Sequence, residues 1–390
     1  MSDLDKENWN NWVAGTGFGF EGPMRILVIR PDRLGDVILS TPVFEVIKRH
    51  YPKSHLTVLV KKEVIPILKG LPHIDHFMTF DPEGKHLGLK GFFRLTTEIR
   101  RRHYKIAIVL QSHWKLAVAL FLARIRYRVG PFSKFHSFLF YNRGMRQRRS
   151  QVEMHEADYN LQLLRKIGIR IGSRTIQTRI YLSDSIQKEV KDWMEQRGWN
   201  PRRNLIAVHP GMGGSALNWP ESHYVDLIRG LISEGKQVLI TGGPSEHELL
   251  SRLEKSLGTL SEKVIVYRTP PERAVDFLAG LFALSDLVVA PSTGPLHLAV
   301  AIQKPVLSFY PPIRVQSALR WGPYLADESQ ASVLVPEAYC GQDFQCLGKQ
   351  CNYFPCMKSL TVKQAIAEIQ KQLLKQSKKI NSGSSNHGSS

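Results

Sequence analysis

Short apolar runs rich in β-branched residues alternate with helical periodicity along the first half of the chain. The runs ILVI at 26–29, LTVLV at 56–60 and IAIVL at 106–110 are typical of strands. Apolar positions recur with helical spacing at 37–47 and again at 155–167. Strands that alternate with helices predict a mostly parallel sheet that is covered on both faces.

A second series of the same kind fills the second half. Its predicted strands are 205–208, 238–241, 264–266, 287–290 and 305–309. The chain is therefore predicted to form an α/β fold with two doubly wound, Rossmann-like domains. The carboxyl ends of the strands in such domains are expected to face a cleft where the ligand binds.

The polar stretch between the two series gives the domain boundary, because it contains a helical pattern followed by GWNP. A last helix is expected from Thr361, which has capping-box spacing to Gln364. We predict a flexible leader at 1–23, an N-terminal domain at 24–184, an interdomain connection at 185–203, a C-terminal domain at 204–358, a C-terminal helix at 359–376 and a disordered tail at 377–390.

Length and composition agree with a soluble protein of two domains. The chain has 390 residues, of which 43% are hydrophobic and 22% charged. The longest apolar run, 116–123, is far shorter than the ~20 residues that a membrane-spanning helix needs. The first 23 residues contain no apolar segment typical of a secretory signal, so a cytoplasmic location is expected.

The positive charge is concentrated in one region. The net charge is +19, and residues 99–152 contain thirteen Lys or Arg, several aromatic residues and no Asp or Glu. A solvated basic face, a nucleic-acid surface and an anionic membrane or lipid surface all have this composition. The candidate contact residues are Arg124, Arg126, Arg128, Lys134, Arg143 and Arg146.

Three glycine-containing turns follow predicted strands of the second half. They are HPGMGGS at 209–215, GGPSE at 242–246 and STGPLH at 292–297. A strand that ends in such a turn and re-enters a helix presents unpaired backbone N–H groups, which suit a phosphate. Each turn alone is more often an ordinary tight turn, but three in one domain favour a nucleotide site. Neither a P-loop nor a G-x-G-x-x-G motif is present.

Asp36 follows the first predicted strand at the start of the next helix. Two interpretations are open, an N-cap and a general base. As a base, its carboxylate would be stabilised by the helix N-terminus and would take a proton from an acceptor hydroxyl. Asp32 is the nearest competitor for this role.

Four segments together resemble glycosyltransferase family 9, the ADP-heptose:lipopolysaccharide heptosyltransferases. They are MRILVIRPDRLGDVILSTP at 24–42, HPGMGGSALNWPESHY at 209–224, ITGGPSEHE at 240–248 and APSTGPLHLAVA at 290–301. The resemblance implies a GT-B fold in which the N-terminal domain binds the acceptor and the C-terminal domain binds the nucleotide sugar. It also implies an inverting transfer without a metal or other cofactor. The implied donor is a nucleotide sugar such as ADP-heptose, and the implied acceptor is a phosphorylated lipid A core at the inner face of the inner membrane. A cationic, aromatic first domain fits a peripheral membrane enzyme.

The same resemblance assigns roles to single residues. Asp36 is the implied catalytic base, Glu246 holds the donor ribose and His297 supports the diphosphate turn. The implied donor-binding residues are Gly211, Met212, Gly213, Gly214, Ser215, Glu246, Ser292, Thr293, Gly294 and His297.

Two positions depart from the pattern of heptosyltransferases. Leu217 stands where many of them carry a Lys that neutralises the donor phosphate, and Ser292 stands where an Asp often contacts the donor sugar. Both changes fall on donor contacts. The alternatives are therefore the same fold with another nucleotide sugar, a sugar-nucleotide epimerase or hydrolase, and, in a different class, a basic nucleic-acid-binding protein.

All four cysteines lie within seventeen residues near the C-terminus, at Cys340, Cys346, Cys351 and Cys356. Zinc sites usually contain C-x-x-C pairs, which are missing from this stretch. We therefore expect reduced thiols that pack a C-terminal loop, with a metal site as the alternative and disulfides as the least favoured state.

Overall fold

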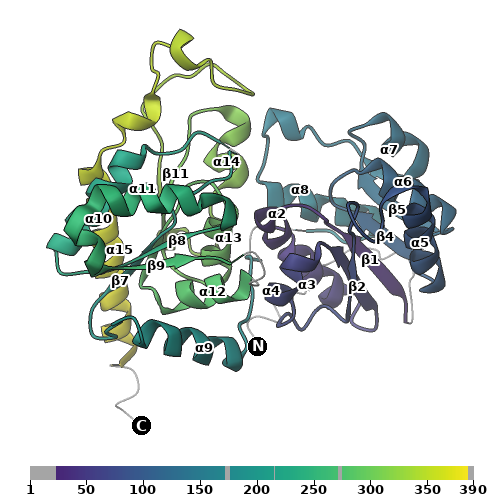
Figure 1. The fold of residues 1–390 in the computed structure, drawn as a ribbon. Coiled ribbons are helices and arrows are strands. Elements are labelled where there is room, and N and C mark those ends of the chain that lie inside the picture. The colour runs from purple at the N-terminus through teal and green to yellow at the C-terminus, as the bar shows by residue number, and fades with distance from the viewer. Residues whose placement is uncertain (1–22, 172–175, 215, 271–274, 385–390) are drawn as a thin grey trace. The chain divides into compact units, whose positions relative to one another are not determined.

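The chain folds into two compact units, Met1–Tyr181 and Leu182–Ser390 (Figure 1). The computed structural model describes residues 23–171, 176–214, 216–270 and 275–384, with 379–384 described by their backbone alone. The predicted leader at 1–23 lies almost entirely outside the described residues. Among those that are described, no helix is both long and apolar enough to span a bilayer.

The first unit contains a six-stranded sheet in the order β3-β2-β1-β4-β5-β6, with every neighbouring pair parallel. Parallel strands need crossover connections, and here these are mostly helices. The strands are β1 Arg25–Ile29, β2 His55–Val60, β3 His76–Thr79, β4 Ile106–Val109, β5 Tyr127–Pro131 and β6 Arg143–Met145. The helices are α2 Leu34–Ile38, α3 Thr41–His50, α4 Ile65–Leu68, α5 Gly88–Arg101, α6 Trp114–Leu122, α7 Phe135–Phe140 and α8 Glu156–Gln162.

The second unit repeats this plan with the order β12-β11-β10-β7-β8-β9, again all parallel. Its strands are β7 Leu205–Val208, β8 Gln237–Gly242, β9 Val264–Arg268, β10 Leu287–Val289, β11 Val306–Phe309 and β12 Ala331–Leu334. Its helices are α9 Asp184–Glu195, α10 Glu221–Ser233, α11 His247–Leu257, α12 Val275–Leu284, α13 Gly294–Ala301, α14 Ala318–Trp321 and α15 Val362–Ser384.

Both sheets have a topological switch point, where successive strands are added on opposite sides. It lies between β1 and β4 in the first unit and between β7 and β10 in the second. Open α/β sheets bind ligands beyond the carboxyl ends of the strands at this point. The predicted fold class is confirmed. The residues that follow β1 and β7 lie where such sheets bind ligands, so they are candidates for a functional site.

A large aromatic cluster anchors the core of the second unit. Trp219 is buried and stacks on Phe309 with ring centres 4.2 Å apart, and its indole N–H donates to the carbonyl of Leu360 at 2.8 Å. A buried indole N–H without a partner would be costly, so this hydrogen bond helps to place the segment before α15. Trp219 therefore belongs to the core of the second unit.

The fold differs from the sequence predictions mainly where elements are short. The strands β3, β5, β6 and β12 have three to five residues each and lack a long β-branched run, so hydropathy did not reveal them. The stretch 185–203, predicted as a connection with a helical pattern, contains most of α9, which packs against α12 and buries Val190 within the second unit. Helix α15 ends at Ser384, whereas the prediction placed its end at 376 and disorder beyond.

Candidate functional site

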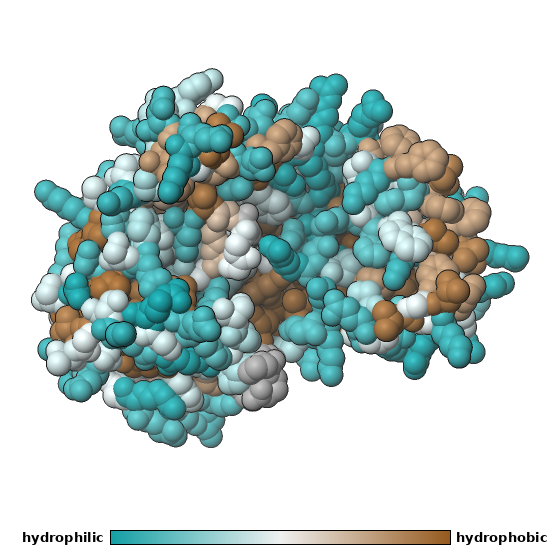
Figure 2. Space-filling model, turned by 45° about the horizontal axis from the view of Figure 1, so that its top comes forward, coloured by the Kyte–Doolittle hydropathy of each residue, from teal (hydrophilic) through white to brown (hydrophobic). Residues whose placement is uncertain are grey.

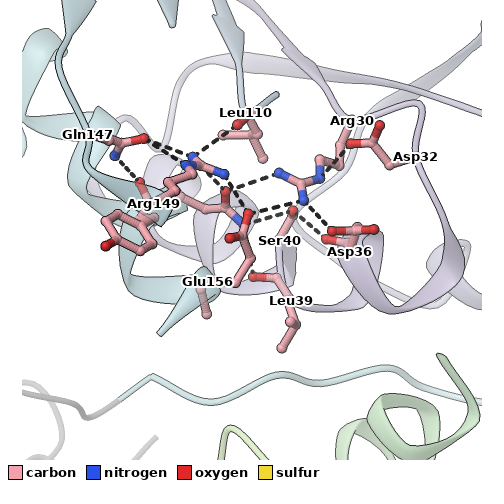
Figure 3. Close-up of polar contacts among 12 residues, drawn as sticks. Arg30, Asp32, Asp36, Leu39, Ser40, Leu110, Gln147, Arg149 and Glu156 are labelled. Carbon is pink, nitrogen blue, oxygen red and sulfur yellow. Dashed lines mark hydrogen bonds and ion pairs between the residues drawn. The ribbon is translucent and has the colours of Figure 1, made fainter. Parts of the chain in front are cut away.

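Arg30, which directly follows β1, is the centre of a buried polar cluster in the first unit (Figure 3). Its side chain is 1% exposed, and its Nη2 donates to Asp36 Oδ1 at 2.6 Å and to Glu156 Oε1 at 3.3 Å. Its Nη1 donates to Asn160 Oδ1 at 3.2 Å, and its Nε lies 2.8 Å from Asp32 Oδ2. A buried guanidinium requires such partners because an uncompensated buried charge is very costly. Arg30 therefore gathers three carboxylates at the carboxyl end of β1.

Asp36 lies in the first turn of α2 but does not cap it. The N-cap is Arg33, and its side chain makes no capping hydrogen bond. The carboxylate of Asp36 points to Arg30 through Oδ1, and no other described side chain pairs with its Oδ2. The side chain is 19% exposed. The N-cap interpretation is therefore wrong, and the Asp36 carboxylate is oriented by Arg30 while its side chain stays partly exposed.

Glu156 joins the Arg30 cluster to the far side of the switch point. Its Oε1 also accepts a hydrogen bond from Arg149 Nη1 at 2.5 Å, and its side chain is only 2% exposed. Arg149 Nη2 donates in turn to the carbonyl of Leu110, directly after β4, at 3.1 Å. The chain of contacts therefore holds β1, α2, β4 and α8 together where a ligand is expected in this sheet.

Asp32 is a second carboxylate of this cluster with an altered proton affinity. Burial raises the pKa of Asp32 to about 6, although the Arg30 guanidinium opposes this change, and the charges of Asp36 and Glu156 add to it. With its amide turned, Gln111 donates to Asp32 Oδ2 at 2.8 Å. Asp32 is therefore a carboxyl group that keeps its proton to a higher pH than an ordinary aspartate does.

The raised pKa predicts a pH-dependent contribution of Asp32 to stability. Because the folded chain holds the Asp32 proton more tightly than the unfolded chain does, this contribution is fully present below about pH 4 and is lost as pH rises through about 6. The loss amounts to about 3 kcal/mol for a shift of about two pH units. Urea unfolding of the wild type and of Asp32→Asn between pH 4 and 7 measures it. The free energy of unfolding of the wild type should fall relative to that of Asp32→Asn between pH 4 and 6, and the two curves should run parallel at higher pH. Curves that are parallel over the whole range would contradict the prediction.

The second unit has its own polar cluster, at the carboxyl ends of β7 and β8. His209 follows β7 and is buried, with Nδ1 2.9 Å from Thr241 Oγ1 in β8 and Nε2 3.3 Å from Glu246 Oε2. Glu246 Oε2 also accepts the backbone N–H of Gly243 at 2.8 Å. Burial opposes ionisation of Glu246, but its hydrogen bonds to His209 and Gly243 outweigh burial and lower its pKa. Glu246 is thus a fixed carboxylate beside the first glycine turn.

Gly211 makes room for this carboxylate. A Cβ atom at position 211 would lie 2.0 Å from Glu246 Oε1, so a larger residue there would displace the carboxylate. The structure therefore brings together two predicted donor residues from different turns, Gly211 and Glu246. Gly213 and Gly214 adopt positive φ angles of 58° and 72°, and a Cβ at either would meet no atom within 4 Å. Met212 between them and Gly211 is buried, and Ser215 lies outside the described residues.

The third turn leads from β10 into α13. Thr293 is the N-cap in extended conformation without a side-chain capping bond, and Pro295 occupies the first turn. In this turn Leu296 and His297 donate their backbone N–H groups to the Thr293 carbonyl at 3.1 and 3.5 Å, and Pro295 has no N–H, so Gly294 supplies the N–H at the start of the helix. His297 is buried within α13. Ser292 hydrogen-bonds to Tyr310, a buried residue whose pKa is raised by burial.

Leu217 packs against the hydrophobic core of the second unit, and its backbone N–H donates to Gln316 Oε1 at 3.3 Å. The position at which many heptosyltransferases carry a lysine is thus filled by an apolar contact.

One of the predicted basic contact residues serves the fold itself. Arg128 donates from Nε to the carbonyl of Phe140 at 2.6 Å and from Nη1 to the carbonyl of Ile125 at 2.5 Å, and its guanidinium lies over the Phe121 ring at 5.3 Å. It therefore ties α7 to the turn before β5. Arg143 is half-buried with its guanidinium 5.5 Å from the Tyr127 ring. The exposed members of the set are Arg124, Arg126, Lys134 and Arg146.

The four cysteines line one small cavity before α15. Cys340, Cys346, Cys351 and Cys356 are half-buried free thiols. Burial, with a smaller contribution from the other three thiols, raises the pKa of Cys356. Among the residues described, no group of three or more His, Cys, Asp or Glu side chains is placed to hold a metal ion. The sequence placed the four thiols in one C-terminal loop, and the structure gathers them around this cavity.

Comparison with known proteins assigns this geometry to a family. A family model described as glycosyltransferase family 9 (heptosyltransferase) matches residues 92–353. The chain belongs to glycosyltransferase family 9. A putative glycosyltransferase of Haemophilus influenzae is 34% identical over 304 residues, which cover 77% of this chain and 86% of the relative. Lipopolysaccharide heptosyltransferase 2 of Salmonella typhimurium is 26% identical, with 74% and 83% covered.

Solved structures agree with this family 9 assignment at the level of the fold. A family 9 glycosyltransferase from Veillonella parvula superposes with a TM-score of 0.79 at 22% identity, covering 90% of this chain and 98% of that structure. The ADP-heptose lipopolysaccharide heptosyltransferase II of Escherichia coli gives 0.74 at 21%, covering 91% and 100%. The family 9 chain is thus a glycosyltransferase of the heptosyltransferase type.

Several residues of the two clusters were not predicted from the sequence. Arg30, Glu156 and Asn160 were not singled out, nor were Arg149 and His209. One signal was present, because Glu156 and Asn160 are four residues apart in a predicted helix and so share one face. That spacing does not say what the face meets, since the partner Arg30 is 126 residues away.

Proposed function

We propose that this family 9 chain transfers heptose from ADP-heptose to a lipopolysaccharide core or lipid A acceptor, with Asp36 as the general base. The observation that carries this proposal is the geometry of Asp36. One of its oxygens is held by Arg30 at 2.6 Å and the other is available at the carboxyl end of β1. A base must combine fixed orientation with access to its substrate, and Asp36 has both.

The proposed reaction is a single displacement at the anomeric carbon. Asp36 Oδ2 accepts the proton of the acceptor hydroxyl while that oxygen forms the new bond to the anomeric carbon. The bond from the anomeric carbon to the donor phosphate oxygen breaks at the same time, and the nucleoside diphosphate leaves with both electrons. Attack opposite the leaving group inverts the anomeric configuration. Arg30 keeps the carboxylate oriented through the reaction.

The second unit is proposed to hold the donor. Glu246 accepts the hydroxyl groups of the ribose, and His209 with Gly243 fixes its carboxylate for that contact. The Gly294 N–H and the positive end of the α13 dipole stabilise the charge that develops on the diphosphate. Ser292 and Leu217 in place of acidic and basic donor contacts support a second candidate, the same transfer from a different nucleotide sugar.

Substitution of Gly211 should weaken the donor site in particular. In Gly211→Ala the new methyl group overlaps the Glu246 carboxylate, which must move away from His209. We expect KM for the donor to rise at least about tenfold. Losing a charge-assisted hydrogen bond costs about 1.5–3 kcal/mol, and this corresponds to at least a tenfold loss of affinity. The matched control is Gly243→Ala, whose Cβ would stay 3.5 Å from Glu246. An unchanged KM in Gly211→Ala would contradict the ribose role.

The decisive test is transfer itself. The purified chain is incubated with a lipopolysaccharide-core acceptor and, in parallel, ADP-heptose or other nucleotide sugars, and the product mass is read by mass spectrometry. A mass gain of one heptose with ADP-heptose alone supports the proposal. A gain with a different sugar keeps the transferase but replaces the donor, and no product with any donor overturns the proposal.

A lipid acceptor places the reaction at a membrane surface. We propose that the chain works as a peripheral protein on the inner face of the inner membrane. The exposed cations Arg124, Arg126, Lys134 and Arg146 lie in the stretch 99–152 that lacks acidic residues, and would meet the phosphates of the acceptor or its lipid neighbours.

A further inference from the structure

Helix α7 has the opposite polarity from a normal surface helix. Its sequence is FHSFLF, and its only buried residue is Ser137. The Ser137 hydroxyl lies 2.6 Å from that of Ser112, while Phe135 is 80% exposed and Leu139 59% exposed. A surface helix ordinarily turns its apolar side chains to the core, so this one presents them to something outside the unit.

The neighbouring helices extend the same surface. Helix α6 contacts α7 and α5, and the Phe121 ring of α6 lies 5.5 Å from Phe140 of α7. Phe121 and Leu122 at the end of α6 are both exposed, as is Phe138 of α7. Figure 2 shows hydrophobic side chains gathered over the part of the first unit where Figure 1 places α5, α6 and α7. We call Phe121, Leu122, Phe135, Phe138 and Leu139 the apolar face.

Cations border the apolar face. Lys134 directly precedes α7 and Arg124 follows α6, and both are exposed. Lys115 lies over the ring of the exposed Trp114 at 5.8 Å, at the start of α6. The whole stretch 99–152 that carries α6 and α7 contains no acidic residue. Exposed Phe, Trp and Leu beside Lys and Arg are what the interface of an anionic bilayer accommodates.

We propose that the apolar face inserts into an anionic lipid bilayer, with Lys134 and Arg124 against its headgroups. This proposal rests on the proposed function, since a lipid acceptor requires the enzyme to reach a membrane, and it names the surface that does so. A second copy of the chain fits less well, because two cationic rims would repel each other. Nucleic acid also fits less well, since phosphates need the cations but not five exposed apolar side chains.

Vesicle sedimentation with the full chain tests this assignment. Wild type should sediment with vesicles of phosphatidylethanolamine and phosphatidylglycerol and much less with phosphatidylcholine alone. The double variant Phe135→Ser with Leu139→Ser should lower the partition coefficient at least about tenfold, because two large apolar side chains lose their transfer into the bilayer interface. The matched control is Leu319→Ser with Tyr339→Ser, which removes two apolar side chains of similar exposure, 57% and 86%, from the second unit.

Three further arms complete the experiment. Lys134→Glu with Arg124→Glu should weaken vesicle binding at low salt. The vesicle binding that this variant retains should depend less on salt than that of the wild type. Asp36→Asn should bind vesicles like the wild type, so that loss of transfer and loss of membrane contact are separable. Circular dichroism checks that each variant is folded.

The proposal is overturned if the Phe135 and Leu139 variant sediments like the wild type, or if the control variant falls equally. It is also overturned if that variant loses self-association in light scattering without losing vesicle binding, or if duplex DNA binds in a salt-dependent way and displaces the vesicles. Vesicle binding by a wild-type chain that transfers sugar from none of the tested donors would overturn the proposed function and leave the apolar face standing.

Discussion

Replacing Asp36 with Asn should lower the rate of sugar transfer by about 10²–10⁴-fold, the usual cost of losing a general base. The amide keeps the size of the side chain and can still contact Arg30, but it cannot take a proton from the acceptor hydroxyl. The expected signature is a fall in kcat with little change in KM for the donor, because the donor contacts lie in the second unit. Steady-state kinetics with saturating acceptor measures both quantities.

The control for Asp36 is Asp32, which pairs with the same arginine. Asp32 Oδ2 lies 2.8 Å from Arg30 Nε, so Asp32→Asn disturbs the cluster to a similar extent without removing the proposed base. We expect Asp32→Asn to lose less than about tenfold in kcat, well below the effect of losing a base. If Asp32→Asn loses the larger factor and Asp36→Asn does not, the base is Asp32, and the role assigned to Asp36 is wrong.

Replacing Glu156 with Ala should be the most destabilising substitution in the first unit's cluster. Glu156 is 2% exposed and accepts hydrogen bonds from both Arg30 and Arg149. Its removal leaves two largely buried guanidinium groups with too little negative charge, and breaking a buried ion pair in this way costs about 3–5 kcal/mol. Urea unfolding at neutral pH measures the loss in free energy of unfolding.

Two variants show whether the Glu156 effect comes from buried charge. Glu156→Gln keeps a hydrogen-bond acceptor and should lose less than Glu156→Ala. Asp226→Ala breaks an exposed ion pair with Arg229, whose side chains are 54% and 48% exposed, and should cost less than about 1 kcal/mol. Equal losses in Glu156→Ala and Asp226→Ala would mean that the cluster does not depend on Glu156 for its stability.

Most of the candidate donor site could be predicted from the sequence. Gly211 and Glu246 lie in turns that follow predicted strands, and both were singled out before their contact was known. Strand ends and small-residue turns are local features, which short sequence patterns reveal. His209 was visible only as the first residue of a turn. Its bridge between Thr241 and Glu246 depends on the pairing of β7 with β8, which is a tertiary fact.

The Arg30 cluster shows the opposite case. Asp36 was proposed from its position after β1, but the residue that orients it was not. In a sequence of net charge +19, nothing distinguishes Arg30 from the other basic residues. In the structure it is buried, and it donates a hydrogen bond to Glu156, which lies 126 residues further along the chain. Sequence spacing gives no information on contacts between elements that far apart, because they are created only when α8 packs beside β1.

For the basic region too, the sequence predicted a general feature and the structure decided the role of each residue. Its composition pointed to a surface, but Arg128 serves the loops around β5, whereas Arg124 and Lys134 are exposed. Composition counts charges without regard to where each side chain is directed.

By itself, the sequence determined the two α/β domains, the family, and the turns that carry Asp36, Gly211 and Glu246, because alternating hydropathy and short motifs are encoded over a few neighbouring residues. The tertiary structure alone decided which charges compensate one another around Arg30 and that α7 turns its apolar residues outward. Both outcomes depend on which distant elements pack together, since packing rather than local spacing fixes which side chains are buried and which partners they meet.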